Sequence, residues 1–387
     1  MRGLLTVLVG LGAALIAGVA LANGSDEPWE PACPPERACP SKETVELGRA
    51  LFLSSAISPA RRSCATCHEP THGYGASAAT TLKFKDLPRS IPSLLNLSHQ
   101  RWFFWDGRAD QLWQQAVGPL ESEAEMNSHR LFMVAAVVSN TKLRTSAMAG
   151  GALGSRELVA LRAALGHSTA SACVNNESCE RAWQTLPRDQ RAVVEAIAHK
   201  LLLSLAAFQV SLKSRWTAYD DYMASGKGLS ERQLRGMKLF FGEARCSSCH
   251  SGPAMTDAGF HNLLLPSPPG RAREDPGRFR GIQHLRALAA SGDMGYVPSE
   301  IAMHLDLNNS VWGQFKTPSI RNLEGRSEFM HNGVYKNLRD VLGYYNTLAD
   351  AQVVHHHQNA LLAPLNFKED QLEDLEAFLR IFTRRRD

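Results

Sequence analysis

Two copies of a five-residue pattern, cysteine-x-x-cysteine-histidine, occur in this sequence, at residues 64–68 and 246–250. This pattern is the attachment signature of c-type haem. Each cysteine can form a thioether bond to a haem vinyl group, and the histidine that follows can place a ring nitrogen on the iron. The six residues are Cys64, Cys67 and His68 in the first copy and Cys246, Cys249 and His250 in the second.

Zinc bound by the two cysteine pairs is the alternative to haem. Zinc ribbons bring such pairs within about twenty residues of each other, whereas nearly half of the chain separates these two. We therefore predict two covalently bound c-type haems as the cofactors, with His68 and His250 as iron ligands.

The composition limits the classes of function. The chain has 387 residues, of which 44% are hydrophobic and 21% charged, so two domains with sizeable cores are expected. Its 42 basic and 38 acidic residues nearly balance, which gives no indication of nucleic-acid binding.

The first 22 residues have the pattern of a secretory signal peptide. Arg2 supplies the positive charge, residues 4–21 are apolar, and small residues end the segment at Ala20 and Ala22. An uncleaved membrane anchor is the alternative, since the apolar stretch is nearly long enough to span a bilayer. We expect export to the periplasm, because bacteria attach c-type haem outside the inner membrane, and membrane association only if the signal stays uncleaved.

Four cysteines lie outside the haem motifs: Cys33, Cys39, Cys173 and Cys179. The two pairs share one short separation, and an oxidising compartment permits disulfide bonds. Local bridges within each pair fit this spacing, although four cysteines allow three pairings and the sequence does not choose among them.

Similar helices must position the two haem motifs. Apolar periodicity predicts a helix at 42–52 and another at 230–241, and the motif follows each, which indicates an internal duplication. We predict a mainly α fold of two cytochrome c-like haem domains in tandem. The predicted boundaries are 1–22 for the signal, 23–225 for the N-terminal domain and 226–387 for the C-terminal domain.

Other segments connect and close these domains. A helix at 110–116 is expected to stop near Gly118-Pro119. Residues 253–309, rich in glycine and proline, are expected to form surface loops. Further helices are predicted at 130–138, 189–216, 334–345 and 369–383.

Several further motifs follow one another in a recognisable order. They are residues 104–110, Gly118-Pro119, Glu125-Met126, 315–322 and 330–333. Through these and the haem motifs, the chain resembles the bacterial di-haem cytochrome c peroxidase family, which includes MauG. The resemblance implies that hydrogen peroxide reacts at the N-terminal haem, with His68 as proximal ligand, and that the C-terminal haem, held by His250, transfers electrons.

The resemblance also implies catalytic residues beside the N-terminal haem. Glu125 stands twenty residues after Trp105, where the family has its distal glutamate, and such a carboxylate can move protons between the peroxide oxygens. A surface acid is the alternative, because other acids are close by. Gln115 and Pro119 match the family's other distal-pocket positions.

Two features bear on how the haems work together. Some members of the family cap the peroxide-binding iron with a histidine about twenty residues past the motif, but residues 80–92 contain none, so we expect an open iron. Trp105 matches the tryptophan between the family's haems, where an aromatic ring can relay an electron or a hole. A core aromatic residue is the alternative.

The sixth ligand of the second iron divides the family. Fourteen residues after His331, where some peroxidases have methionine and MauG has tyrosine, this chain has Tyr345. Methionine raises a haem's potential, whereas a phenolate stabilises oxidised iron. We expect Tyr345 to ligate the His250 iron. The alternatives are Tyr344, Met330 and Met294.

Two possible metal sites have weak support. The family's inter-domain calcium site uses threonine and proline carbonyls just before the histidine motif, but residues 326–328 differ here, and Ser90 stands where an asparagine ligand is usual. Calcium is therefore doubtful. Adjacent histidines at 355–357 are expected in a solvated loop.

Three functions follow from the resemblance. The first is peroxide reduction with electrons from a small donor protein, a cytochrome c or a cupredoxin. The second is MauG-type, peroxide-dependent oxidation of a residue on a partner protein. The third is non-catalytic di-haem electron transfer, which Glu125, Gln115 and the missing capping histidine argue against, since a pure carrier keeps both irons six-coordinate.

Overall fold

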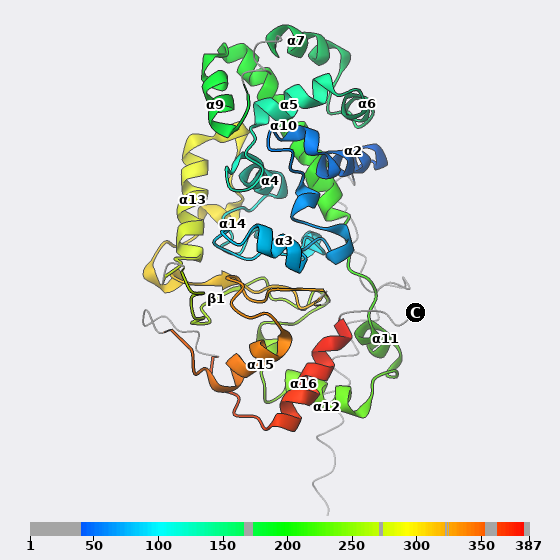
Figure 1. Ribbon diagram of the computed structural model, residues 1–387, viewed down its shortest axis with the longest axis vertical. Helices are drawn as coiled ribbons and strands as arrows, with labels where there is room; N and C mark the ends of the chain where they lie inside the picture. The colour runs from blue at the N-terminus through cyan, green and yellow to red at the C-terminus, as the bar shows by residue number, and fades with distance from the viewer. Residues whose placement is uncertain are drawn as a thin grey trace, which may run out of the picture.

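The computed structural model describes residues 40–165, 173–270, 274–321, 323, 325–352 and 362–382. The predicted signal peptide, Cys33, Cys39 and the histidines at 355–357 lie outside these residues. The described chain is mainly helical, and its helices form an upper and a lower group (Figure 1). The predicted mainly α fold is confirmed.

The upper group surrounds one long central helix, α10 (Arg188–Val210). This helix is long and apolar enough to cross a bilayer, but Ile197, Leu201 and Leu205 are buried in the core of the group. It ends at Val210, before the predicted residue 216. Other helices of this group are α2 (Lys42–Leu53), α3 (Ala78–Lys83), α4 (Leu112–Glu121), α5 (Arg130–Ser139), α6 (Thr141–Ala149), α7 (Ser155–Leu165) and α9 (Asn176–Thr185).

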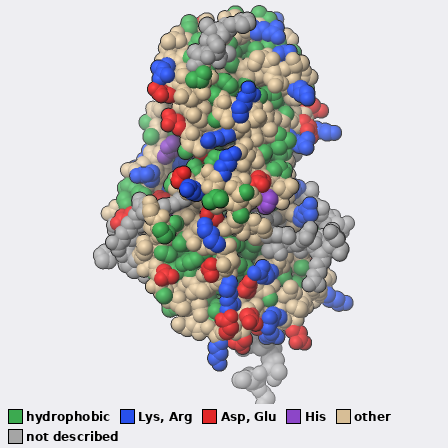
Figure 2. Space-filling model, in the orientation of Figure 1, with side chains coloured by type: hydrophobic (Ala, Val, Ile, Leu, Met, Phe, Trp, Pro, Cys, Tyr) green, Lys and Arg blue, Asp and Glu red, His purple; other side chains and the backbone are tan. Residues whose placement is uncertain are grey.

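The lower group is smaller. It contains α11 (Ala218–Ser225), α12 (Glu231–Phe241), α15 (Leu338–Thr347) and α16 (Glu369–Leu379). Charged side chains of both signs are interspersed at this end of the molecule (Figure 2), where Arg235 of α12 pairs with Asp374 of α16 at 2.7 Å. Two short antiparallel strands, β1 (Phe260–His261) and β2 (Phe315–Lys316), run between the groups.

The helix before each haem motif makes the same contact in both groups. A Cβ atom on Gly48 of α2 would lie 1.9 Å from the Ser204 carbonyl oxygen of α10. A Cβ atom on Gly236 of α12 would lie at the same 1.9 Å from the Asp374 carbonyl oxygen of α16. Only glycine permits so close a crossing of two helices. The duplication therefore extends to the helix packing.

Residues 253–309 are not all loops, so that prediction is wrong. They include α13 (Arg278–Ser291) and α14 (Glu300–Met303). The core-facing stripe of α13 is narrow, with Ile282 and Leu285 buried and charged residues on the other faces, which weakens its apolar periodicity. Although α13 follows the second haem motif, Leu285 belongs to the core of the upper group. The domain boundary at residue 225 stays a prediction.

The predicted helix end near Gly118 is also wrong. Helix α4 continues through Pro119 to Glu121. Proline lacks the N–H for one helical bond, but the Ser122 N–H donates to the Gly118 carbonyl at 2.9 Å and closes the last turn.

Candidate active site

One cavity of about 1790 Å³ reaches both haem motifs. Pockets for a single small molecule usually have roughly 300–1,000 Å³, so this cavity has room for more than one large group. It includes the attachment residues Cys67, His68, Cys246, Cys249 and His250 and the predicted site residues Trp105, Gln115, Glu125 and Tyr345. The fold thus brings together residues from distant parts of the sequence.

The two motif histidines are oriented alike. Nδ1 of His68 lies 3.1 Å from the Tyr74 carbonyl oxygen, and Nδ1 of His250 lies 3.3 Å from the Met255 carbonyl oxygen. A carbonyl oxygen only accepts, so Nδ1 carries the proton in each ring and Nε2 keeps a lone pair for a metal. Burial lowers the pKa of His68 to about 4 and also lowers the pKa of His250. Both rings are therefore neutral and suited to bind a haem iron.

Residues 103–109 and 329–335 form the same turn, a repeat that we did not predict. In each turn the first N–H donates to the last carbonyl at 2.8 Å, and the second and fifth residues have positive φ. Both turns share a phenylalanine, an aromatic or imidazole ring, an aspartate or asparagine, and a glycine. This pattern makes Trp105 and His331 equivalent, and it is the signal that could have revealed the repeat.

The helix after each turn holds another equivalent pair. Helices α4 and α15 have ten residues each and begin three residues after their turns. Pro119 and Tyr345 both occupy the eighth position of the helix, and both line the cavity. Proline offers no side-chain atom that could ligate iron, whereas tyrosine offers a phenol oxygen.

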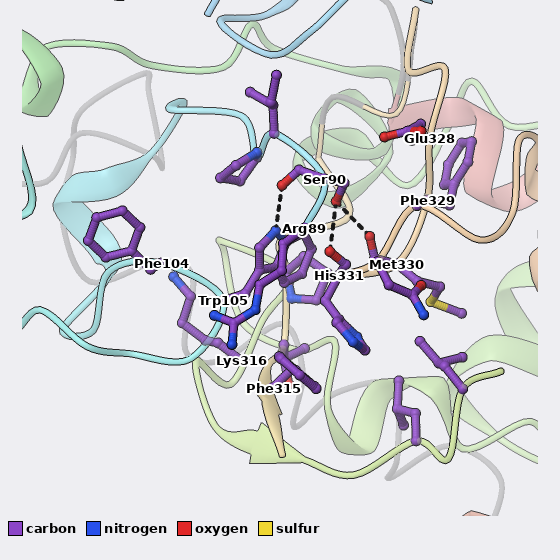
Figure 3. A pocket seen from close by; sticks show the side chains of 18 of the residues that line it. Arg89, Ser90, Phe104, Trp105, Phe315, Lys316, Glu328, Phe329, Met330 and His331 are labelled. Carbon is purple, nitrogen blue, oxygen red and sulfur yellow. Dashed lines mark hydrogen bonds between the residues drawn. The ribbon is translucent and has the colours of Figure 1, made fainter. Parts of the chain in front are cut away.

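Trp105 is buried where the two turns meet (Figure 3). Its Nε1–H donates to the Ser90 carbonyl at 2.9 Å, and the Ser90 N–H donates to the His331 carbonyl at 2.8 Å. The Trp105 and His331 rings lie 6.5 Å apart, and Phe315 stacks on His331 at 3.4 Å. The Ser90 hydroxyl, in the place of the usual calcium ligand, donates to the Met330 carbonyl at 2.7 Å. Ser90 therefore connects the two repeated turns.

A buried lysine lies close to the same tryptophan. The backbone N–H of Lys316 donates to the Trp105 carbonyl at 2.7 Å, and its Nζ donates to the Trp102 carbonyl at 2.9 Å. Burial lowers the pKa of Lys316 to about 7. We did not identify this residue from the sequence, because its burial results from contacts between distant segments.

Glu125 differs in its surroundings from the acids beside it. Glu123 is exposed, and Glu121 pairs with Arg130 at 2.8 Å. Glu125 is half-buried in the cavity wall, and burial raises its pKa, although the charge of Arg108 opposes this effect. The same wall contains Gln115, whose buried Oε1 has no hydrogen-bond partner among the described residues. A carboxyl group and an amide oxygen without a described partner therefore border the cavity that His68 also lines.

Among the described residues, no histidine of the segment after the first motif is placed to cap the iron of the first haem. His72 pairs with Glu69 at 3.2 Å, and neither His72 nor His99 is part of the cavity lining. The histidines that do line the cavity are His68, His250, His261, His284 and His331.

The alternatives to Tyr345 are placed differently. The Tyr344 hydroxyl donates to the Leu263 carbonyl, and Met294 belongs to the core of the upper group. Met330 lines the cavity, as Tyr345 does. Burial raises the pKa of Tyr345, so a phenolate at this position needs a cation such as a metal ion.

The chain is similar to known di-haem proteins. Residues 42–228 match the family described as di-haem cytochrome c peroxidase. Cytochrome-c peroxidase IdrP2 of Pseudomonas sp. (strain SCT) is 26% identical, over 98% of this chain and 92% of that protein. Methylamine utilization protein MauG of Methylorubrum extorquens is 29% identical, over 87% and 77%. The crystal structure of the diheme peroxidase BthA from Burkholderia thailandensis has the same fold, with a TM-score of 0.65 at 22% identity, over 89% and 86% of the two chains.

Proposed function

Because the chain belongs to the di-haem cytochrome c peroxidase family, we propose that it is an exported enzyme that reduces hydrogen peroxide in the periplasm. The reaction consumes one peroxide, two electrons and two protons and forms two waters. The peroxide site is the haem of the first motif, and electrons pass through the haem of the second. Glu125 and Gln115 line the cavity that His68 also lines, and this observation supports the proposal.

A c-type haem supplies an iron that can exchange electrons with peroxide at an open coordination position. The carboxylate of Glu125 takes the proton from one peroxide oxygen and returns it to the other, and its raised pKa suits both steps near neutral pH. The unpartnered Oε1 of Gln115 orients a peroxide O–H by accepting its hydrogen bond. Pro119 keeps the space open because it has no ligating atom.

Trp105 is the proposed electron relay between the two halves. Its ring contacts His331 of the equivalent turn, and its indole N–H is held by the Ser90 carbonyl. These contacts fix the orientation of the ring at the boundary that electrons must cross. The electron donor would be a small cytochrome c or a cupredoxin.

Peroxide-dependent oxidation of a residue on a partner protein is the second candidate function. Tyr345 favours it, because a phenolate ligand lowers a haem's potential and makes reduction by a small donor less favourable. The relative MauG, which is 29% identical, belongs to methylamine utilization. In both candidate functions Glu125 and Trp105 have the same roles.

The test is a comparison of resting and reacting protein. Covalent haem content should be two per chain, and the resting EPR spectrum should show one high-spin and one low-spin ferric iron. Rapid peroxide turnover with a reduced small cytochrome supports the first function. Reaction of the fully oxidised protein with peroxide, without fast turnover by such donors, supports the second. A resting spectrum with two low-spin irons and no peroxide reaction would mean an electron carrier.

A further inference from the structure

Arg326 is a partly buried cation without an anion among the described residues. It lines the large cavity, and also a small one beside it. Among the described residues, no hydrogen bond or ion pair holds its guanidinium group. Burial lowers its pKa, and no carboxylate of the described residues offsets that effect. A guanidinium group withdrawn from water is unfavourable unless an anion or hydrogen-bond acceptors replace the water.

The guanidinium group of the buried Arg278 donates to the Gly107 carbonyl at 2.7 Å. Several other arginines that are buried or partly buried in this protein have carboxylate partners. Their pairs are Arg89 with Asp106 and Asp275, Arg130 with Glu121 and Asp293, and Arg321 with Asp220. Two acids of the described residues in this part of the molecule have other partners. Glu328 accepts the Lys336 ammonium at 2.6 Å, and Glu69 accepts the hydroxyl of Ser77 at 2.7 Å. A group from outside the described part of the chain is therefore needed to pair with Arg326.

The surroundings of Arg326 indicate where that partner lies. Arg326 belongs to a loop of the C-terminal half, yet this loop packs against the segment that follows the first haem motif. The Ser327 hydroxyl lies 3.0 Å from the Thr81 hydroxyl, and the small cavity beside Arg326 is bordered by Gly75 and Ile91. The same segment contains Tyr74, whose carbonyl orients His68.

A haem attached to the chain through its two vinyl groups presents its two propionate carboxylates at the opposite edge. We propose that Arg326 is a binding site for a propionate of the His68 haem. The planar guanidinium group can hold a carboxylate with two parallel hydrogen bonds. The C-terminal half thus supplies an anion-binding group to the cofactor of the N-terminal half. This assignment rests on the proposed attachment of haem at the first motif.

The test measures the reduction potential of each haem in the Arg326→Gln protein. Ferric haem carries one positive charge more than ferrous haem, so loss of a nearby cation stabilises the ferric state. We expect the potential of the His68 haem to shift downward, and by more than that of the His250 haem. The control is Arg101→Gln, which removes the same charge from an exposed position outside the cavity lining. Potentials equal to those of this control would overturn the proposal.

A second variant keeps the test decisive if the Arg326→Gln protein does not acquire both haems. Arg326→Lys retains the charge without the two-pronged geometry, so we expect both haems to load and the propionate bending band of the His68 haem to shift in the resonance Raman spectrum. An unshifted band would contradict the assignment. Fewer than two covalent haems in the unaltered protein would instead refute the proposed function, and this result separates the two failures.

Discussion

Trp105 and His331 occupy the same position of a repeated turn, and their rings meet at 6.5 Å with an angle of 66° between their planes. The two halves of the molecule therefore touch through equivalent residues. Ser90 holds the pair from one side, because it accepts from the Trp105 indole and donates to the His331 carbonyl. We expect an electron that passes between the two proposed haem sites to use this contact.

We expect Trp105→Phe to slow electron transfer between the two haems. The change removes the indole and leaves the Ser90 carbonyl without its donor, at a cost of about 1 kcal/mol in stability. Stopped-flow reduction, followed separately at the two haems, measures the effect. Trp102→Phe is the control, since Trp102 is also buried nearby. If electron transfer in Trp105→Phe has the unaltered rate, Trp105 is only a core aromatic residue and not a relay.

Peroxide turnover should depend on Glu125. Removal of a proton-transferring group costs roughly a hundredfold or more, so Glu125→Gln should keep both haem spectra and lose most turnover. Glu123→Gln, which changes an exposed acid two residues away, is the matched control and should have normal turnover. A Glu125→Gln protein as active as this control would show that another group moves the protons.

The pH dependence of turnover follows from the same residue. Glu125 must be deprotonated to accept the peroxide proton, and burial raises its pKa. Activity should therefore fall as the pH decreases through a value above the ordinary glutamic acid pKa of about 4.3. A profile of turnover rate against pH, measured at saturating donor concentration, checks this. If the Glu125→Gln protein loses activity over the same pH range, another titrating group is responsible.

Tyr345 and Tyr344 allow a paired test of the second iron. Tyr345→Phe removes the proposed ligand, so the low-spin EPR signal of the His250 haem should change, whereas Tyr344→Phe should leave it intact because Tyr344 bonds the Leu263 carbonyl. Tyr345→Met should raise the potential of this haem. If Tyr345→Phe has an unaltered spectrum, Met330 becomes the candidate ligand.

Cys173 and Cys179 should form a disulfide in the exported protein. Their buried thiols are in hydrogen-bonding contact, which favours this pairing over the others that the sequence allows. Closure of so short a loop should stabilise the fold by about 2 kcal/mol. Mass spectrometry of peptides before and after reduction tests the bond, and two free thiols in protein purified from the periplasm would contradict it.

Short-range chemistry was readable from the sequence alone. The two haem motifs are recognisable because their reactive atoms come from five consecutive residues. The helices at Lys42–Leu53 and Glu231–Phe241 were predicted closely because their apolar stripes repeat within a few turns. Glu125, Trp105 and Tyr345 were found through the order and spacing of motifs that resemble a known family, and their chemical roles stay predictions.

The tertiary structure decided what depends on distant segments. Glu123 and Glu125 are alike as residues, but only Glu125 lines the cavity. The packing of α13 on the upper group and the contact between Trp105 and His331 each join residues far apart in the chain. Among the described residues, Arg326 has no carboxylate partner because the fold pairs Glu328 with Lys336 instead. Burial and pairing are properties of the folded surroundings, and no local pattern of residues encodes them.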